Sequence, residues 1–224
     1  MNRYLVLYNS VSAALWTYVL GCVFRDARGY WTSNQQSLYG KPMPLAVMEA
    51  LLLHTPPHHF LVLLQFFNAV FETGHTVLGL VPSPLTTVLL QFASRLLITH
   101  GITLNLPYAP GNFHPAYMGL TFSWAATEVT RYSYYVVKLV NGTAPRWFTW
   151  LRYSLFIVLY PMGLVCEATV VYLSLMVAVG NYYWFLIFGL AMYVPGFLVL
   201  YSYMWRQRRK TLGKHIIEVK INRQ

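Results

Sequence analysis

Acidic residues are scarce in this sequence. Asp and Glu together number six among 224 residues: Asp26, Glu49, Glu72, Glu128, Glu167 and Glu218. Charged residues of both signs make up 10% of the chain, whereas a soluble globular domain carries about 25%. So few charges cannot keep a compact domain of this size in solution. The composition therefore excludes an ordinary water-soluble domain.

Cysteine is also rare, since Cys22 and Cys166 are the only two. Both lie in apolar runs, and they match neither a metal site nor a disulfide framework. They therefore indicate little about the redox compartment of the protein.

The net charge of +10 would suit a protein that binds nucleic acid. The basic residues, however, are not interleaved with aromatic residues on a polar surface. Much of the positive charge lies instead at the end of the chain. We therefore expect no nucleic-acid partner.

Long apolar runs are abundant, and hydrophobic residues make up 57% of the chain. The length accommodates roughly six spans of about 20 residues, with no separate water-soluble domain. Proline- and glycine-containing turns separate several of the runs. The spans are expected at residues 4–24, 58–81, 84–105, 113–137, 147–173 and 182–205. The predicted fold is an all-α membrane protein, with a bundle of six transmembrane helices over residues 1–205 and a basic tail over 206–224.

Six spans place both termini on one side of the membrane. That side then holds ten basic residues, namely Arg3, Lys138, Arg146 and seven in the tail. The opposite side holds three, at Arg25, Arg28 and Lys41. Because cytosolic loops carry the excess of Lys and Arg, both termini are predicted to be cytosolic. The basic tail suits an anchor at an anionic lipid surface, and it also suits a contact with an acidic cytosolic ligand.

Several ionisable residues fall inside the predicted spans: Glu72, His75, Arg95, Glu128, Arg131 and Glu167. Such groups are costly in hydrocarbon and usually face the interior of a bundle. Glu72 and His75 are three residues apart, as are Glu128 and Arg131, so each pair shares one helix face. Two interpretations remain open for Arg95, Glu128 and Arg131: neutralising pairs that hold the bundle together, or residues that serve the chemistry.

Glu167 has no basic residue within a turn or two of its own helix. Tyr160 lies seven residues earlier, which places it on the same helix face two turns away. An isolated carboxyl in apolar surroundings can exchange a proton near neutral pH. A phenol can donate a proton or a hydrogen bond. The two residues therefore suggest an acid–base pair inside the membrane.

Five short blocks of sequence between residues 4 and 210 occur in the same order as in a known family pattern. One block is Tyr160-Pro161-Met162-Gly163 followed by Glu167. The others are Tyr4 to Asn9 with Trp16, Glu72-x-x-His75-x-x-x-Gly79-x-Val81-x-Ser83, Gln91-x-x-Ser94-Arg95, and Trp124-x-x-x-Glu128-x-x-Arg131-Tyr132-x-x-Tyr135. Together they resemble the (3R)-3-hydroxyacyl-CoA dehydratases of very-long-chain fatty acid elongation, a family first labelled protein tyrosine phosphatase-like A. Each block alone is a weak signal, but five in register are specific.

The resemblance implies a multi-pass enzyme of the endoplasmic reticulum membrane that removes water from a very-long-chain (3R)-3-hydroxyacyl-CoA. The product is a trans-2-enoyl-CoA, and the step is the third of the elongation cycle. The family's catalytic Tyr and Glu correspond to Tyr160 and Glu167. Residues that bind substrate or support the site are expected to be Arg95, Glu128, Arg131, Tyr135 and Arg152. The reaction needs no metal or redox cofactor.

The same resemblance implies three kinds of partner. They are the acyl-CoA substrate, membrane lipid, and the other elongation enzymes, namely the condensing enzyme, the ketoacyl-CoA reductase and the enoyl-CoA reductase. The sequence departs from the family pattern at Cys166, beside Glu167, and at His100, and both are expected to alter the pocket. The C-terminus also lacks the dilysine retrieval signal of some members.

Two other functions were weighed. A non-catalytic scaffold could bind the elongation enzymes, although intact Tyr160 and Glu167 argue against it. The residues His54-Thr-Pro-Pro-His58-His59 match a histidine box of membrane di-iron oxidases. Such sites need about eight histidines in several boxes, and the chain has seven, most of them isolated. Pro56 and Pro57 also spoil a helical ligand face. Acyl-chain preference, oligomeric state and the residues that hold CoA are not predicted.

Overall fold

The computed structural model describes residues 3–32, 58–81 and 84–221 of the chain, with side chains for 3–28, 61–81 and 84–213. Over these residues the regular structure is helical throughout, with no strand. The elements are α1 (Arg3–Thr32), α3 (His58–Val77), α4 (Leu85–Leu96), the π-helix η1 (Leu97–Leu104), the 3₁₀ helix η2 (Pro110–Phe113), α5 (Pro115–Asn141), α6 (Arg146–Arg152), α7 (Phe156–Ser174) and α8 (Asn181–Ile221). The all-α prediction is confirmed.

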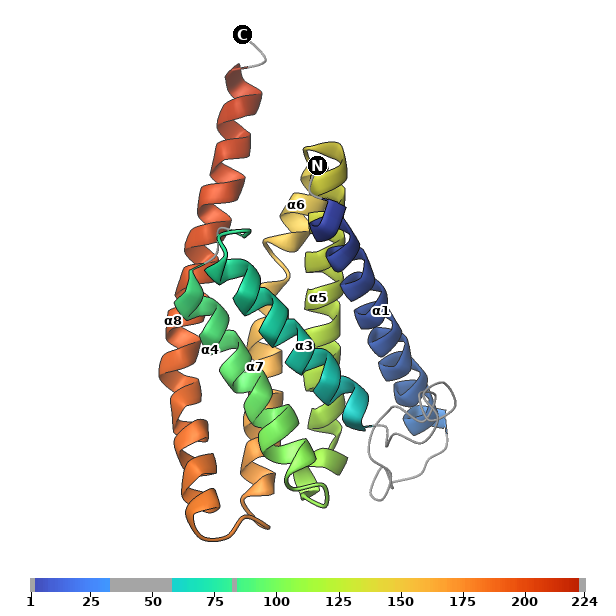
Figure 1. Cartoon of the computed structure of the whole chain (residues 1–224), viewed down its shortest axis with the longest axis vertical. Coiled ribbons are helices and arrows are strands. Elements are labelled where there is room, and N and C mark those ends of the chain that lie inside the picture. Colours follow the sequence, from blue (N-terminus) through green and yellow to red (C-terminus); the bar gives the residue numbers. More distant parts are fainter. Residues whose placement is uncertain (1–2, 33–57, 82–83, 222–224) are drawn as a thin grey trace.

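The long helical segments alternate in direction along the chain (Figure 1). They are α1, α3, α4 continued by η1, α5, α6 followed by α7, and α8. As a result, the start of α1 and the end of α8 lie at the same end of the molecule, together with α6 (Figure 1). We call this the α6 end and the other the η2 end.

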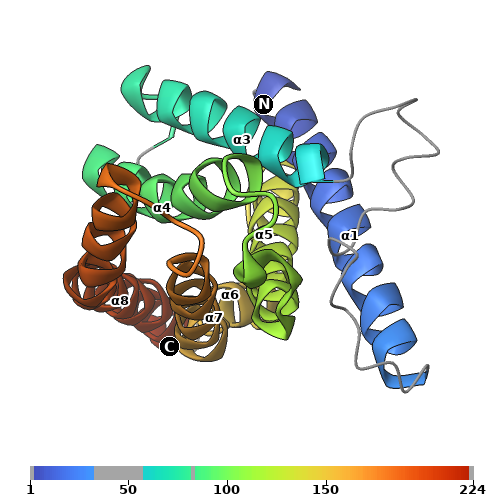
Figure 2. The same cartoon turned by 90° about the horizontal axis from the view of Figure 1, so that it is seen from below.

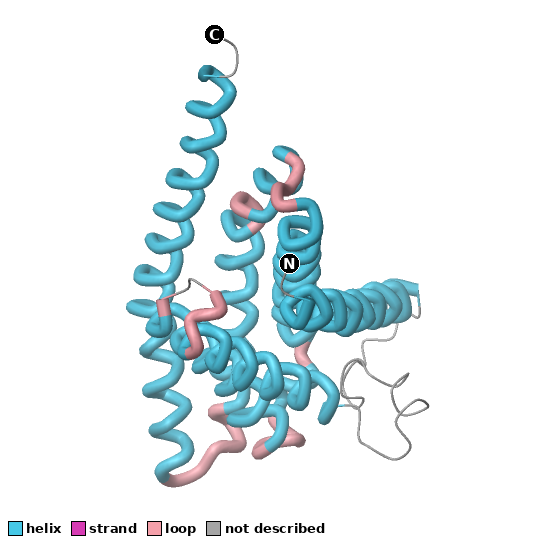
Figure 3. The backbone as a smooth tube through the Cα atoms, turned by 45° about the horizontal axis from the view of Figure 1, so that its top comes forward, coloured by secondary structure: helices cyan, strands magenta, loops and turns pink. Residues whose placement is uncertain are grey.

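Helix α5 packs against both α1 and α7, while α8 contacts α7 and α4. Seen along the bundle, α4, α5, α7 and α8 are arranged around a common centre, with α3 outside α4 (Figure 2). Helix α1 crosses α5 obliquely and extends away from the bundle at its C-terminal end (Figures 2 and 3). The four helices around the centre are those that position the site described below.

Apolar side chains fill the core and also cover the outside. The fully buried set includes Trp16, Leu61, Ile98, Leu120 and Val170. Large apolar residues are nevertheless exposed on the outer helices, with Val165 at 64% and Trp184 at 67%. Water-soluble proteins rarely expose apolar surface on this scale. A surface of this kind matches a bilayer interior.

Four helical segments are long and apolar enough to cross a membrane: Arg3–Arg28, Leu85–Leu104, Arg146–Ser174 and Asn181–Gly213. Helices α3 and α5 are not among the four. They carry the buried polar or charged residues Gln65, Asn68 and Glu128 and the half-buried Arg131, which lower their hydropathy.

Two predicted spans differ from the structure in detail. The fifth is divided, because α6 ends at Arg152 and α7 begins at Phe156. In the turn between them the carbonyl of Leu151 accepts hydrogen bonds from the backbone N–H groups of Ser154 and Leu155. The sixth does not end at residue 205, since α8 continues to Ile221. Arg, Lys and Gln are good helix formers, so the basic sequence after Trp205 does not end the helix.

Candidate active site

A cavity of about 750 Å³ lies between α4 with η1, α5, α7 and α8. All seven residues that the sequence singled out as catalytic or supporting line it: Arg95, Glu128, Arg131, Tyr135, Arg152, Tyr160 and Glu167. They come from four separate helices, so the fold brings together residues up to 72 positions apart, from Arg95 to Glu167. The predicted grouping of these residues is therefore present in the structure.

Tyr160 and Glu167 both face the cavity from α7, as their spacing predicts. Gly163 and Leu164 lie between them and line the same wall. A Cβ atom added to Gly163 would lie 3.3 Å from the Cβ of Ser123 on α5. The absence of a side chain at this position therefore lets α7 pack closely on α5, which sets the depth of the cavity wall.

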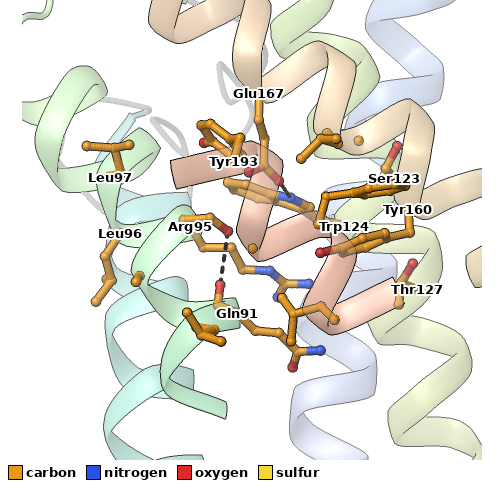
Figure 4. Close-up of a pocket in the computed structure, with 18 of the residues that line it drawn as sticks. Gln91, Arg95, Leu96, Leu97, Ser123, Trp124, Thr127, Tyr160, Glu167 and Tyr193 are labelled. Atoms are coloured by element: carbon orange, nitrogen blue, oxygen red, sulfur yellow. Dashed lines mark hydrogen bonds between the residues drawn. The ribbon is translucent and has the colours of Figure 1, made fainter. Parts of the chain in front are cut away.

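Glu167 is buried, with 7% of its surface exposed. The indole N–H of Trp124, on α5, donates a hydrogen bond of 2.7 Å to its carboxylate oxygen Oε1 (Figure 4). Tyr193, from α8, lies beside the same carboxyl group (Figure 4). A buried carboxyl with one fixed donor has a defined orientation, and its second oxygen stays available to a bound molecule.

Tyr160 points into the cavity from the other end of the same wall (Figure 4). Its ring stacks on Phe197 of α8, with ring centroids 5.5 Å apart and planes 10° from parallel. Tyr201 stacks on the pair in turn, with its centroid 6.2 Å from that of Tyr160. This aromatic stack fixes the plane of the phenol while leaving its hydroxyl toward the interior.

Two acids and two bases form a buried ion network beside this wall. Arg95 donates to Oε1 of Glu128 at 2.6 Å, and Arg131 donates from Nε to Oε2 of the same carboxylate at 2.7 Å. Arg131 also donates to both oxygens of Glu72, which further accepts from the hydroxyl of Tyr132. The network joins α3, α4 and α5 and is neutral overall. It matches the interpretation that these residues hold the bundle together.

One expected pair does not form. Glu72 and His75 share a face of α3, but Glu72 binds Arg131, and the Nε2 of His75 hydrogen-bonds with the hydroxyl of Tyr4 at 2.8 Å. The planar guanidinium of an arginine can donate two parallel hydrogen bonds to one carboxylate, which an imidazole cannot. The interhelical partner therefore replaces the partner one turn away.

A known protein family matches the part of the chain that forms this cavity. The family model described as "Protein tyrosine phosphatase-like protein, PTPLA" matches residues 66–214. This stretch contains every residue of the cavity wall described above. The chain belongs to this family.

Curated relatives match most of the chain. The "Very-long-chain (3R)-3-hydroxyacyl-CoA dehydratase PASTICCINO 2" of Arabidopsis thaliana is 34% identical over 94% of this chain and 93% of its own. A "Probable very-long-chain (3R)-3-hydroxyacyl-CoA dehydratase" of Schizosaccharomyces pombe is 32% identical over 93% and 92%. The "Very-long-chain (3R)-3-hydroxyacyl-CoA dehydratase 1" of Mus musculus is 35% identical over 70% and 61%. No solved structure matches the chain significantly.

The two cysteines do not support the phosphatase activity that the PTPLA family description names. A cysteine phosphatase would hold a reactive thiolate in an electropositive loop. Cys22 instead lies within α1 and Cys166 within α7. A Cβ atom on Gly119 of α5 would approach the sulfur of Cys166 to 2.6 Å, so this thiol packs between helices. Cys166 does not line the cavity, which differs from its expected effect on the pocket. His100, the other departure from the family pattern, does line the cavity.

The cavity of this PTPLA-family member is polar at its α6 end. Arg152 lies there, with its guanidinium carbon 6.0 Å from the ring centroid of Tyr135 and 5.5 Å from that of Tyr153. Its buried Nε has no hydrogen-bond partner in the part of the chain that the structure describes. Tyr203 and Gln207 of α8 complete this end. The arrangement leaves donors for an anionic or polar ligand group.

Toward the η2 end the lining becomes mostly apolar, with His100 and Asn105 as polar exceptions. Leu96 and Leu97 come from α4 and η1, and Phe185, Phe188 and Met192 from α8. The hydroxyl of Tyr182 donates to the carbonyl of Gly101, which the π-helical turn of η1 presents to α8. The cavity therefore has a polar end, an ionisable middle and an apolar end.

Sequence reasoning missed two residues that contact Glu167. Trp124 was noted only as part of a family block, although it lies one turn before Glu128 on the same face. Tyr193 was not considered. On α8, Tyr193, Phe197, Leu200 and Met204 follow the i, i+4, i+7, i+11 spacing of one helix face, and all line the cavity. That spacing was the available signal.

Among the described side chains, no group of three His, Cys, Asp or Glu residues is placed to hold a metal ion. The histidine box at residues 54–59 lies outside the described side chains. The structure therefore does not test that motif.

Proposed function

We propose that this protein is a very-long-chain (3R)-3-hydroxyacyl-CoA dehydratase that acts in the third step of the fatty acid elongation cycle. The observation that carries the proposal is the pair of Tyr160 and Glu167 on one wall of a cavity inside a membrane-type helical bundle. The names of its curated relatives agree with this activity.

The reaction requires two proton movements on neighbouring carbons. One group must remove a proton from Cα, which the thioester acidifies, and another must protonate the hydroxyl that leaves Cβ. In the proposed mechanism Glu167 is the base and Tyr160 is the acid. The Cα–H electron pair becomes the Cα=Cβ bond as the Cβ–O bond breaks, and water leaves. A proton then passes from Glu167 back to the Tyr160 oxygen to restore both groups.

The two side chains are about 10 Å apart along the helix axis at the backbone. They can therefore converge on the Cα hydrogen and the Cβ hydroxyl of a substrate bound between them, with its Cα–Cβ bond lying across the wall. The opposite assignment of acid and base satisfies the same geometry. Trp124 supports the first assignment, because its N–H donates to a Glu167 oxygen and so stabilises the carboxylate form that a base needs.

The gradient of polarity along the cavity gives the substrate a direction. The CoA moiety is proposed to lie at the α6 end, near Arg152 and Tyr135. The thioester and 3-hydroxyl would lie in the middle, and the fatty chain toward the η2 end against Leu97 and Phe188. Burial of the chain there contributes about 0.8 kcal/mol per methylene.

The proposed topology has six membrane spans with both termini in the cytosol, in the endoplasmic reticulum membrane. The two helices that fall short in hydropathy, α3 and α5, would cross with their polar and charged residues facing the interior of the bundle. The alternating helix directions and the basic residues Arg3, Lys138 and Arg146 at the α6 end support this orientation. Glycosylation of Asn141 in cells would contradict it, since that residue would face the cytosol.

The other enzymes of the elongation cycle are proposed partners, because the substrate is the product of a ketoacyl-CoA reductase and the product is the substrate of an enoyl-CoA reductase. The activity is tested by incubating purified protein with (3R)- and (3S)-3-hydroxyacyl-CoAs of graded chain length. We expect trans-2-enoyl-CoA from the 3R series only. Absence of product at every length would exclude the proposed function.

A further inference from the structure

Tyr193 is a buried cavity residue whose hydroxyl has no assigned task. It lies on α8, lines the cavity and has 8% of its surface exposed. Its hydroxyl lies beside the Glu167 carboxyl (Figure 4), and no hydrogen bond of normal distance and angle joins it to any of the described residues. Buried hydroxyl groups are nearly always paired. The unpaired hydroxyl therefore indicates that an acceptor occupies this place in the substrate complex.

The proposed reaction contains an acceptor that neither Tyr160 nor Glu167 serves. As the Cα proton leaves, negative charge moves onto the thioester oxygen. Enzymes stabilise such charge with donors fixed in advance at the position of the developing oxyanion. Glu167 accepts the proton and Tyr160 protonates the leaving hydroxyl, so a third group is required.

The placement of Tyr193 suits that role. The thioester oxygen lies about 2.4 Å from the Cα atom that Glu167 deprotonates, because only the carbonyl carbon separates them. A hydroxyl next to Glu167 is therefore next to this oxygen. The single N–H of the neighbouring Trp124 indole is already engaged with Glu167, and Arg95 is directed toward Glu128 by its hydrogen bond to that carboxylate.

We propose that the Tyr193 hydroxyl donates a hydrogen bond to the thioester oxygen and stabilises the enolate-like transition state. The inference rests on the proposed dehydratase function. The proton stays on Tyr193 throughout. The Cα–H electron pair moves toward the thioester oxygen, and it returns to form the Cα=Cβ bond when the Cβ–O bond breaks.

The test compares Tyr193→Phe, which removes only the hydroxyl, with Tyr172→Phe on the outward face of α7, where the tyrosine is 60% exposed. We expect Tyr193→Phe to lower kcat by about 10²–10³-fold, the usual effect of removing one oxyanion donor. Tyr172→Phe should equal the wild type. If the wild type dehydrates the substrate and the Tyr193→Phe variant is equally active, the inference is overturned, while the proposed function stays intact. If the wild type itself shows no dehydration, the proposed function is excluded, and the inference falls with it.

A second measurement separates a contact to substrate from a contact that only orients Glu167. The probes are a trans-2-enoyl-CoA and the matching thioether, in which a CH₂ group replaces the carbonyl. The wild type should bind the thioester up to about tenfold more tightly, which is the effect of one neutral hydrogen bond. Tyr193→Phe should bind both alike. Equal binding of the two probes by the wild type, or an unchanged preference in the variant, would contradict the proposal whether or not the variant is catalytically active.

Discussion

The indole N–H of Trp124 and the carboxylate of Glu167 are joined by a 2.7 Å hydrogen bond across the interface of α5 and α7. The guanidinium carbon of Arg95 lies 5.4 Å from the centroid of the Trp124 ring, and Arg95 is bound in turn to Glu128. Trp124 therefore connects the proposed base to the ion network that joins α3, α4 and α5. The orientation of this proposed catalytic group depends on contacts made by three other helices.

Trp124→Phe keeps an aromatic ring in this position and removes the donor. The Glu167 carboxylate then loses its fixed partner, and hydrogen bonds to charged groups are worth about 1.5–3 kcal/mol. We expect kcat to fall about 10- to 100-fold with KM nearly unchanged, as measured by steady-state dehydration. Trp184→Phe, at a 67% exposed position on α8, is the matched control. Equal rates for the two variants would show that the bond to Glu167 does not serve catalysis.

Glu128→Gln removes the central carboxylate of the ion network. Arg95 and Arg131 would then share a buried site without their common partner, and breaking a buried pair costs about 3–5 kcal/mol. The measurement is thermal unfolding of the purified protein in detergent, and we expect a large fall in the midpoint. Arg25→Gln is the control, because Arg25 has 43% of its side chain exposed and pairs with its neighbour Asp26. Exposed pairs contribute at most about 1 kcal/mol. A midpoint equal to that of the control would argue against a structural role for the network.

Arg152→Gln tests the position of CoA. We expect KM for the CoA substrate to rise about tenfold with kcat little changed, since the proposed contact is to the nucleotide phosphates and a charge-assisted hydrogen bond is worth about 1.5–3 kcal/mol. The same acyl chain on N-acetylcysteamine lacks those phosphates, so its kinetics should not change. If activity falls equally with the CoA and the N-acetylcysteamine thioesters, Arg152 stabilises the fold and does not bind CoA.

Gly189→Val tests the position of the fatty chain. A Cβ atom at Gly189 would come within 2.7 Å of Leu97 Cδ2, so both side chains would occupy the apolar end of the cavity. At about 0.8 kcal/mol per methylene, displacing two methylenes lowers kcat/KM for the longest substrates about tenfold, while short chains are unaffected. Gly213→Val, in the same helix where nothing lies within 4 Å of the added atom, is the control. A uniform effect at all lengths would place the chain elsewhere.

The sequence predicted the features that follow from the geometry of one helix. A seven-residue spacing was sufficient to place Tyr160 and Glu167 on one face of α7, and apolar runs were sufficient to locate the helices. The ionisable residues inside the spans added Arg95, the basic residues near the predicted cytosolic face added Arg152, and the family resemblance added Tyr135. The structure places all three in the same cavity.

The contacts between helices were beyond such reasoning. Glu72 pairs with Arg131 from another helix rather than with His75 one turn away, and such a pairing between α3 and α5 depends on the tertiary arrangement of the helices. Tyr193 was missed for the same reason, since α8 shows no charged residue that would mark its cavity face. The predicted sixth span ends at residue 205, whereas α8 continues to Ile221, because the Arg, Lys and Gln residues of the charged segment favour helix.

Turnover of a (3R)-3-hydroxyacyl-CoA by the wild type, Tyr160→Phe and Glu167→Gln tests the central claim most directly. Each substitution removes one proton-transfer group and little volume, and general acid–base catalysis contributes about 10²–10⁴-fold. We expect each variant to unfold at the wild-type temperature and to lose at least about a hundredfold in dehydration rate. Wild-type rates in either folded variant would contradict the acid–base pair on which the account depends.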